Sequence, residues 1–243
     1  MGNFFYYFCR ELFLLPLRPV TRFHYDGMEN VPLTGPALVL SNHISHFDPP
    51  YLAAKFPRVI HFMADKPLLE IPVMGKMLKW GHAFPIDRTK NDRGAIKTTL
   101  ARLEAGNLVG VFPEGGIRHG KTATLNGAEL PVGTASLWRM TDVPVIPMLI
   151  IGADQIYAWK RLCRDRPRIF VRVGKPLPPD KSASREELRD RIVAAWLELF
   201  DGMRRDYRIH PEELPQSAQA RWGVPEPSPA TAGPADGSHS SPK

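Results

Sequence analysis

The stretch ALVLSNHISHFDPP, residues 37–50, combines an apolar run, a polar turn and the start of a helix. Residues 37–41 are typical of a buried strand, and the two prolines at 49 and 50 suit the first turn of a helix, for which Asp48 is a natural N-cap. His43 and Asp48 are five positions apart, and on a continuous helix this spacing would separate them by about 140°. Their side chains can therefore meet only if the chain turns between the strand and the helix.

An imidazole that is oriented by a carboxylate acts as a general base. We interpret His43 as a candidate base and Asp48 as the group that orients it. Two other interpretations fit the same residues. Asp48 can simply cap a helix next to a polar loop histidine, or His43, His46 and Asp48 could ligate zinc.

Apolar runs and amphipathic stretches alternate outward from this segment, between residues 37 and 205. This alternation predicts an α/β fold, a single domain with a mixed, mostly parallel sheet flanked by helices, and ligands at the strand ends. One helix should contain Ile96, Leu100 and Leu103 and end at Gly106. The last helix should begin with a Ser184–Glu187 capping box, followed by the apolar stripe Leu188, Ile192, Trp196, Leu199 and Met203. The predicted strands are Ala37–Ser41, Arg58–Met63, His82–Ile86, Leu108–Phe112, Val143–Ile151 and Arg168–Val173.

The two ends of the chain differ from the middle. Near the N-terminus, one helical stripe is formed by Phe4, Phe5, Phe8, Leu12 and Leu15. Charged residues at 10 and 11 interrupt it, and a charged side chain at the bilayer centre costs about 2.5–3.5 kcal/mol. We therefore expect residues 1–22 to be an interfacial membrane-binding helix, a helix docked on the core being the alternative. Residues 23–210 should form the folded domain, and the Pro-, Ser- and Gly-rich residues 211–243 should be disordered.

The charge of the chain indicates the chemistry of its partners. The net charge is +7, so an anionic membrane surface is an expected partner. Nucleic acid is not expected, because no recognition motif accompanies the charge. The only cysteines, Cys9 and Cys163, form no CxxC pair, which argues against a disulfide framework or a cysteine-based zinc site. We expect the protein on the cytoplasmic face of the cell membrane, as a peripheral or monotopic protein.

Four short blocks, in order along the chain, resemble the signature blocks of the 1-acylglycerol-3-phosphate acyltransferase family. They are Asn42-His-x-Ser-x-x-Asp-Pro49, Phe84-Pro-Ile-Asp-Arg88, Val111-Phe-Pro-Glu-Gly115 and Val143-Pro-Val-Ile-Pro147. The resembling region extends over residues 24–178, roughly two-thirds of the chain. One such block would be weak evidence, whereas four in the same order are specific.

The resemblance implies an O-acyltransferase and assigns roles to individual residues. His43 would deprotonate the acceptor hydroxyl, which attacks an acyl thioester, and Asp48 would hold the imidazole. Arg88 would bind the acceptor phosphate, for which a planar guanidinium is suited, and Lys66 would lie near that phosphate.

The third block is implied to shape the acceptor site through Glu114 and Gly115. The family often continues this block with a Thr-Arg-Ser run. Here Gly116 and Ile117 come first, so Arg118 would serve as the family arginine shifted by one position.

The implied reaction gives phosphatidic acid from 1-acylglycerol-3-phosphate, for phospholipid biosynthesis. The lysophospholipid acceptor could also be another lysolipid or glycerol-3-phosphate. The acyl thioester donor is acyl-CoA or acyl-carrier protein, and no cofactor or metal is expected beyond it.

A rival interpretation comes from residues 115–122, which match the phosphate-binding pattern GxxxxGK[ST]. Such a loop needs a helix that begins at Lys121, so that its N-terminal amides meet the phosphates. The residues that follow contain Asn126-Gly127 and Pro131, which are turn signals. We therefore keep a P-loop nucleotide-binding protein only as a remote alternative. A serine hydrolase has no GxSxG motif to support it.

Overall fold

A seven-stranded sheet forms the centre of the protein, as described by a computed structural model of residues 2–87 and 92–222. The strand order is β1-β7-β6-β2-β5-β3-β4, and every neighbouring pair is parallel except β6 and β7. The strands are β1 Arg22–Asp26, β2 Ala37–Ser41, β3 Ile60–Asp65, β4 Phe84–Ile86, β5 Leu108–Val111, β6 Val145–Ile151 and β7 Arg168–Val173. The carboxyl ends of β2, β3, β5 and β6 therefore lie at one edge, where ligands gather in α/β sheets.

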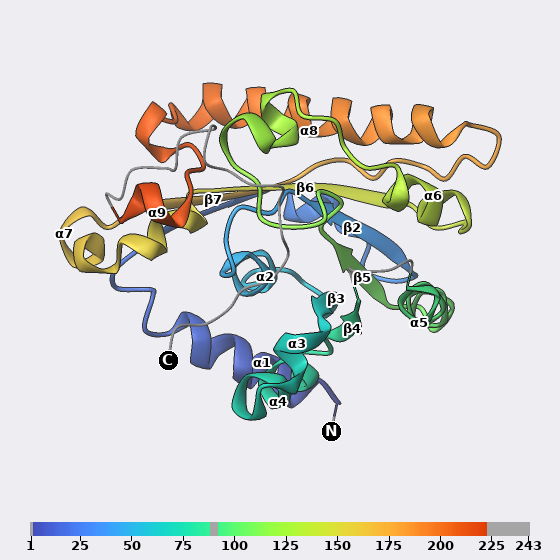
Figure 1. The fold of residues 1–243 in the computed structure, drawn as a ribbon, viewed down its shortest axis with the longest axis horizontal. Coiled ribbons are helices and arrows are strands. Elements are labelled where there is room, and N and C mark those ends of the chain that lie inside the picture. The colour runs from blue at the N-terminus through green and yellow to red at the C-terminus, as the bar shows by residue number, and fades with distance from the viewer. Residues whose placement is uncertain (1, 88–91, 223–243) are drawn as a thin grey trace, which may run out of the picture.

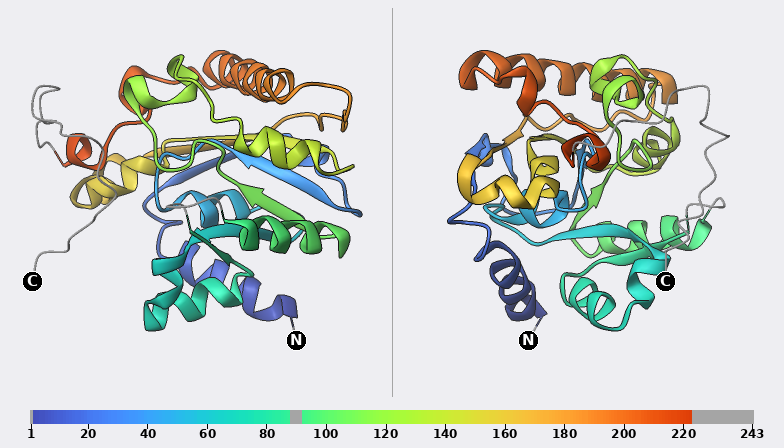
Figure 2. Two further views of the ribbon diagram at one scale, coloured as in Figure 1. Left: turned by 45° about the vertical axis from the view of Figure 1, so that its right-hand side comes forward. Right: turned by 60° about the vertical axis from the view of Figure 1, so that its left-hand side comes forward.

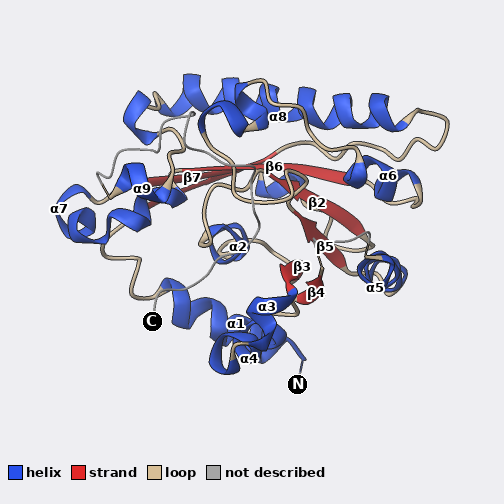
Figure 3. Cartoon of the chain, viewed as in Figure 1, coloured by secondary structure: helices blue, strands red, loops and turns tan. Residues whose placement is uncertain are grey.

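Helices cover both faces of this sheet (Figure 1). The α-helices are α1 Gly2–Leu14, α2 Asp48–Ala53, α3 Lys66–Glu70, α4 Pro72–Trp80, α5 Arg93–Glu104, α6 Gly133–Arg139, α7 Leu162–Asp165, α8 Arg185–Tyr207 and α9 Ala218–Arg221. The 3-10 helices are η1 Met28–Asn30, η2 Gly120–Thr122, η3 Thr124–Asn126, η4 Ala153–Arg161 and η5 Pro211–Glu213. One apolar core contains residues of α1, α2 and η4, and the other contains residues of α5, α6 and α8. Figure 3 shows α8 lying lengthwise along one face and α2 on the other.

Strand β2 is buried on both faces, as its continuous apolar sequence requires. Val39 packs in the core on the α2 side, whereas Leu38 and Leu40 pack in the core on the α8 side. The indole Nε1 of Trp196, on α8, donates to the carbonyl of Leu40 at 3.2 Å. The strand that leads into the turn between His43 and Asp48 is thus packed on both faces.

The predicted fold class is confirmed, and each predicted strand is present within two residues of its expected start. The capping box is also present, since Ser184 N donates to Glu187 Oε2 and Glu187 N donates to Ser184 Oγ. Helix α5 ends just before Gly106, as expected. Strand β1 was not predicted, because Arg22, His24 and Asp26 alternate with its apolar residues and make it resemble a polar segment.

Helix α1 presents the predicted stripe to solvent. The exposed fractions are 70% for Phe4, 50% for Phe8 and 55% for Leu12, whereas Tyr6 and Cys9 on the other side are buried. Helix α1 is therefore docked on the core through Tyr6, Cys9 and Leu14, as the alternative expected, while the apolar stripe on its other side stays exposed. Within residues 2–87 and 92–222, no helix is both long and apolar enough to cross a bilayer.

The prediction of disorder from residue 211 onward is wrong for residues 211–222. Glu213, in η5, pairs with Arg168 of β7, and Arg221, in α9, donates from Nε to the buried Asp154 at 2.7 Å. Composition suggested disorder, but these two charged residues find partners that are distant in the sequence. Residues 223–243 lie outside the described residues.

Candidate active site

The turn between β2 and α2 carries the candidate base. Asp48 is the first residue of α2 and not its N-cap, which is Phe47. Its carboxylate is directed back over the preceding turn, where Oδ2 accepts from the backbone amides of Ile44 at 2.7 Å and Ser45 at 2.9 Å. The expected turn between strand and helix is therefore present, and Asp48 holds it closed.

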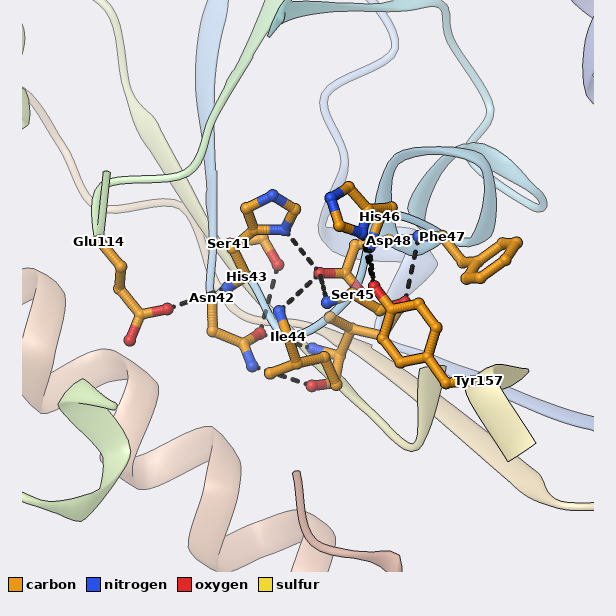
Figure 4. A network of polar contacts seen from close by, with 11 residues as sticks. Ser41, Asn42, His43, Ile44, Ser45, His46, Phe47, Asp48, Glu114 and Tyr157 are labelled. Carbon is orange, nitrogen blue, oxygen red and sulfur yellow. Dashed lines mark hydrogen bonds and ion pairs between the residues drawn. The ribbon is translucent and has the colours of Figure 1, made fainter. Parts of the chain in front are cut away.

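The same oxygen meets the imidazole of His43. The Nδ1 atom of His43 lies 2.8 Å from Oδ2 of Asp48, and the other ring nitrogen points away from Asp48 (Figure 4). Asp48 is completely buried, whereas the His43 side chain is 12% exposed. A buried carboxylate that accepts from Nδ1–H fixes the tautomer with a free Nε2, which is the form that can take a proton from a hydroxyl.

The ring of Phe112 fixes the imidazole from the side. The two rings are stacked, with centroids 4.1 Å apart and planes 19° apart. Phe112 follows β5, the neighbour of β2 in the sheet. No role was predicted for Phe112, although it lies inside the third block, directly before Pro113 and Glu114.

Glu114 joins the active-site turn to the loop after β5. Its Oε2 accepts from the amide of His43, and its Oε1 accepts from the amide of Thr124, both at 2.9 Å. The residue is only 4% exposed, and burial raises the pKa of its carboxyl, although the two amides act in the opposite direction. Glu114 therefore contacts the backbone of the base, and Figure 4 shows it on the opposite side of His43 from Asp48.

Gly115 and Arg118 are brought to the same place. Gly115 has a left-handed backbone with φ of 72°, which favours glycine. The amide of Arg118 donates to the carbonyl of His43 at 2.8 Å, and its side chain is exposed, with Nε 3.4 Å from the carbonyl of Glu114. The structure thus collects His43, Asp48, Glu114, Gly115 and Arg118 around one turn.

Lys66, one of the two predicted phosphate ligands, is not part of this cluster of contacts. Lys66 is exposed and begins α3, directly after β3. Because β3 is parallel to β5, Lys66 lies at the same sheet edge as the turn, two strands from β2. Arg88 lies outside the described residues, after strand β4.

Two contacts from β6 and η4 anchor the turn, and neither was predicted. Asn42 exchanges two hydrogen bonds of 2.9 Å with the backbone of Ile150, as a neighbouring strand would. The hydroxyl of Tyr157 contacts Nδ1 of His46 at 2.6 Å and accepts from its amide at 3.1 Å. Tyr157 is separated from His46 by 111 positions, so no local pattern could have indicated this pair.

The geometry argues against both alternative interpretations of the motifs. His46 is directed to Tyr157 and not to His43 and Asp48, and within the part of the chain that is described no three His, Cys, Asp or Glu side chains are grouped to hold a metal. In the P-loop pattern, Lys121 lies in the single 3-10 turn η2, and the next α-helix begins only at Gly133. No α-helix begins at Lys121, so the motif lacks the helix N-terminus that a P-loop requires, and the structure argues against this remote alternative.

Comparisons with known proteins agree with this geometry. A family model described as Acyltransferase matches residues 22–151. The 1-acyl-sn-glycerol-3-phosphate acyltransferase of Bacillus subtilis is 31% identical over 175 residues, covering 71% of this chain and 82% of the relative. The enzyme of the same name from Helicobacter pylori is 28% identical over 171 residues, covering 69% and 71%. The crystal structure of the 1-acyl-sn-glycerophosphate acyltransferase of Thermotoga maritima has the same fold, with a TM-score of 0.65 at 20% identity over 82% of this chain and 79% of that one.

Proposed function

We propose, from the premise that the chain belongs to the acyltransferase family, that it acylates the free hydroxyl of 1-acylglycerol-3-phosphate and forms phosphatidic acid. The chain is an enzyme of the acyltransferase type, with the family's mostly parallel sheet. The single observation that carries the proposal is the buried Asp48 carboxylate 2.8 Å from Nδ1 of His43, with the other ring nitrogen left available.

The reaction follows from this pair. Nε2 of His43 takes the proton of the acceptor hydroxyl while the hydroxyl oxygen attacks the thioester carbonyl carbon. The imidazolium that results is stabilised by Asp48. When the C–S bond breaks, the leaving thiolate receives that proton, so the products are an ester and a free thiol and His43 is neutral again.

Phosphate chemistry supports a phosphorylated acceptor. Arg88 and Lys66 are the proposed ligands of the acceptor phosphate, and Arg118 and Glu114 shape the entrance next to the base. A phosphate needs paired, permanently charged donors, and arginine provides them in a planar fork. The names of the relatives from Bacillus subtilis and Helicobacter pylori support 1-acylglycerol-3-phosphate over another lysolipid or glycerol-3-phosphate. The donor is an acyl thioester, either acyl-CoA or acyl-carrier protein, and the chemistry above uses no cofactor.

The proposed location is the cytoplasmic face of the membrane. The exposed stripe of α1 supports an interfacial position, since Phe4, Phe8 and Leu12 are each at least half exposed. The acceptor and the product are both lipids, so a site next to a bilayer shortens their exchange. The basic chain, at +7, favours an anionic leaflet.

The test offers purified protein a panel of lysolipids and glycerol-3-phosphate together with labelled acyl-CoA or acyl-carrier protein. Phosphatidic acid should form from 1-acylglycerol-3-phosphate at the highest kcat/KM. If another acceptor gives a higher value, the proposed acceptor is wrong. If none is acylated with either donor, the proposed reaction is wrong.

A further inference from the structure

Helices α3 and α4, with Ile71 between them, carry a second group of exposed apolar side chains besides those of α1. Their exposed fractions lie between 38% and 73%, far above those of core residues. The group consists of Leu68 at 38%, Ile71 at 48%, Val73 at 73%, Met74 at 47% and Trp80 at 44%. Large apolar side chains gathered on one surface indicate a partner.

This group is continuous with the stripe on α1. The ring of Phe5 stacks on the indole of Trp80, with centroids 5.1 Å apart and planes 28° apart. Figure 2 shows α1, α3 and α4 together at one end of the molecule, away from α8. The exposed side chains of the three helices therefore form one surface. It consists of Phe4, Phe8, Leu12, Leu68, Ile71, Val73 and Met74.

The α3–α4 turn is held in one shape. A Cβ atom on Gly75 would lie 2.1 Å from the carbonyl oxygen of Leu69, so only glycine permits this approach of α4 to α3. The amide of Gly75 also donates to the carbonyl of Ile71 at 2.6 Å. The exposed side chains at 73 and 74 are thus presented by a packed turn, which lowers the entropy lost when they bind.

The charges of α4 indicate what covers this surface. Lys76 and Lys79 are exposed on the helix that carries Val73 and Met74. Apolar side chains bordered by lysines are typical of helices that lie in the interface of an anionic bilayer. A second protein copy bound to this surface through a two-fold axis would bring the lysines of the two copies together, which is unfavourable.

We propose that α3 and α4 dock, together with α1, onto the surface of an anionic bilayer, with Val73 and Met74 among the acyl chains. The inference rests on the proposed function in one respect, namely that the acceptor is a lipid. Its consequence concerns substrate entry. Lys66 begins α3 directly at the carboxyl end of β3, at the same sheet edge as the His43 turn. A bilayer bound to α3 and α4 would deliver the lysolipid phosphate past Lys66 to this edge.

The test measures the fraction of full-length protein that sediments with vesicles of phosphatidylcholine and phosphatidylglycerol. Val73→Glu and Met74→Glu should each lower the partition coefficient about tenfold, the effect expected from withdrawing one large apolar side chain from lipid. The matched control is Met140→Glu. Met140 is 57% exposed and caps α6, on the other face of the sheet, and its substitution should leave vesicle binding unchanged.

Three outcomes would overturn the inference. Unchanged binding of both α4 variants, with loss only in Phe8→Glu, would leave α1 as the sole docking element. An equal loss in Met140→Glu would show a general charge effect. A wild-type dimer in solution that Met74→Glu converts to a monomer would make a second copy the occupant.

Acyl transfer to a short-chain lysophosphatidic acid, presented as a monomer without vesicles, separates this inference from the proposed function. Both α4 variants should retain the wild-type kcat in that assay. If the wild type itself is inactive there and in vesicles, the proposed function fails whatever the vesicle binding shows.

Discussion

Replacing Asp48 separates two tasks of one carboxylate. Its Oδ2 accepts from the backbone amides of Ile44 and Ser45 and lies 2.8 Å from Nδ1 of His43. Asp48→Ala leaves both buried amides without an acceptor, at about 1–3 kcal/mol for each. The variant should therefore lose about 2–6 kcal/mol of unfolding free energy.

Asp48→Asn keeps an oxygen for the two amides but removes the charge that stabilises the imidazolium. Its new amide NH2 takes the place of Oδ1, a buried atom with no hydrogen-bond partner among the described residues, so the loss of stability should be about 1–3 kcal/mol. The kcat for acyl transfer should fall by about 10²–10⁴. Asp48→Asn should therefore lose most of its kcat with a smaller loss of unfolding free energy than Asp48→Ala.

The assays are urea unfolding and initial rates with saturating acceptor and donor. Asp154→Asn is the matched control, because Asp154 is also fully buried and its Oδ2 accepts from Gln216 N and Arg221 Nε. It should lose stability while the folded protein keeps its kcat. A near-normal kcat in Asp48→Asn would refute the orienting role, and equal stability of the Ala and Asn variants would refute the account of the turn.

Three further predictions concern other residues. His43→Ala should lower kcat by about 10²–10⁴ without a change in unfolding free energy beyond about 1 kcal/mol, and wild-type activity in that variant would exclude the base. Arg88→Ala should raise the KM for the acceptor much more than that for the donor, so a defect confined to the donor would contradict its role. Burial, with Arg102 and His82, lowers the pKa of His61 to about 4. In the unfolded chain His61 binds a proton below about pH 6.5, whereas in the folded protein it binds one only near pH 4. The free energy of unfolding is therefore highest above about pH 6.5 and falls by about 3 kcal/mol towards pH 4. Urea unfolding should show a flatter pH profile in His61→Gln, and identical profiles would contradict this assignment.

The parts of the site that the sequence predicted are local. Strand β2, the turn and the start of α2 lie within residues 37–53, and the prolines and the Asp48 carboxylate act within that span. A spacing of five between His43 and Asp48 was enough to require the turn, and the 2.8 Å contact confirms that the chain folds back. The capping box of α8 was predictable for the same reason, because Ser184 and Glu187 bond across three positions.

The contacts that were missed join distant segments, including the one made by Glu114, whose place in the site was predicted but whose partners were not. Glu114 reaches the amide of His43 across 71 positions, and Tyr157 reaches His46 across 111. Arg221 meets Asp154 across 67 positions and orders a segment whose composition suggested disorder. Such pairs are set by which strands become neighbours in the sheet, and a single sequence gives no direct measure of that order.

Three consecutive amides of the active-site turn are already bonded to carboxylates, and this limits where the transition state can be stabilised. The amide of His43 donates to Glu114, and those of Ile44 and Ser45 donate to Asp48. An amide that donates to a carboxylate is not available to the negative charge that develops on the thioester oxygen. Donors for that oxygen must therefore come from outside residues 43–45, and the turn itself serves to hold the base. The two acids act from opposite sides of His43, Glu114 on its backbone and Asp48 on its ring, so the position and the orientation of the imidazole are fixed separately.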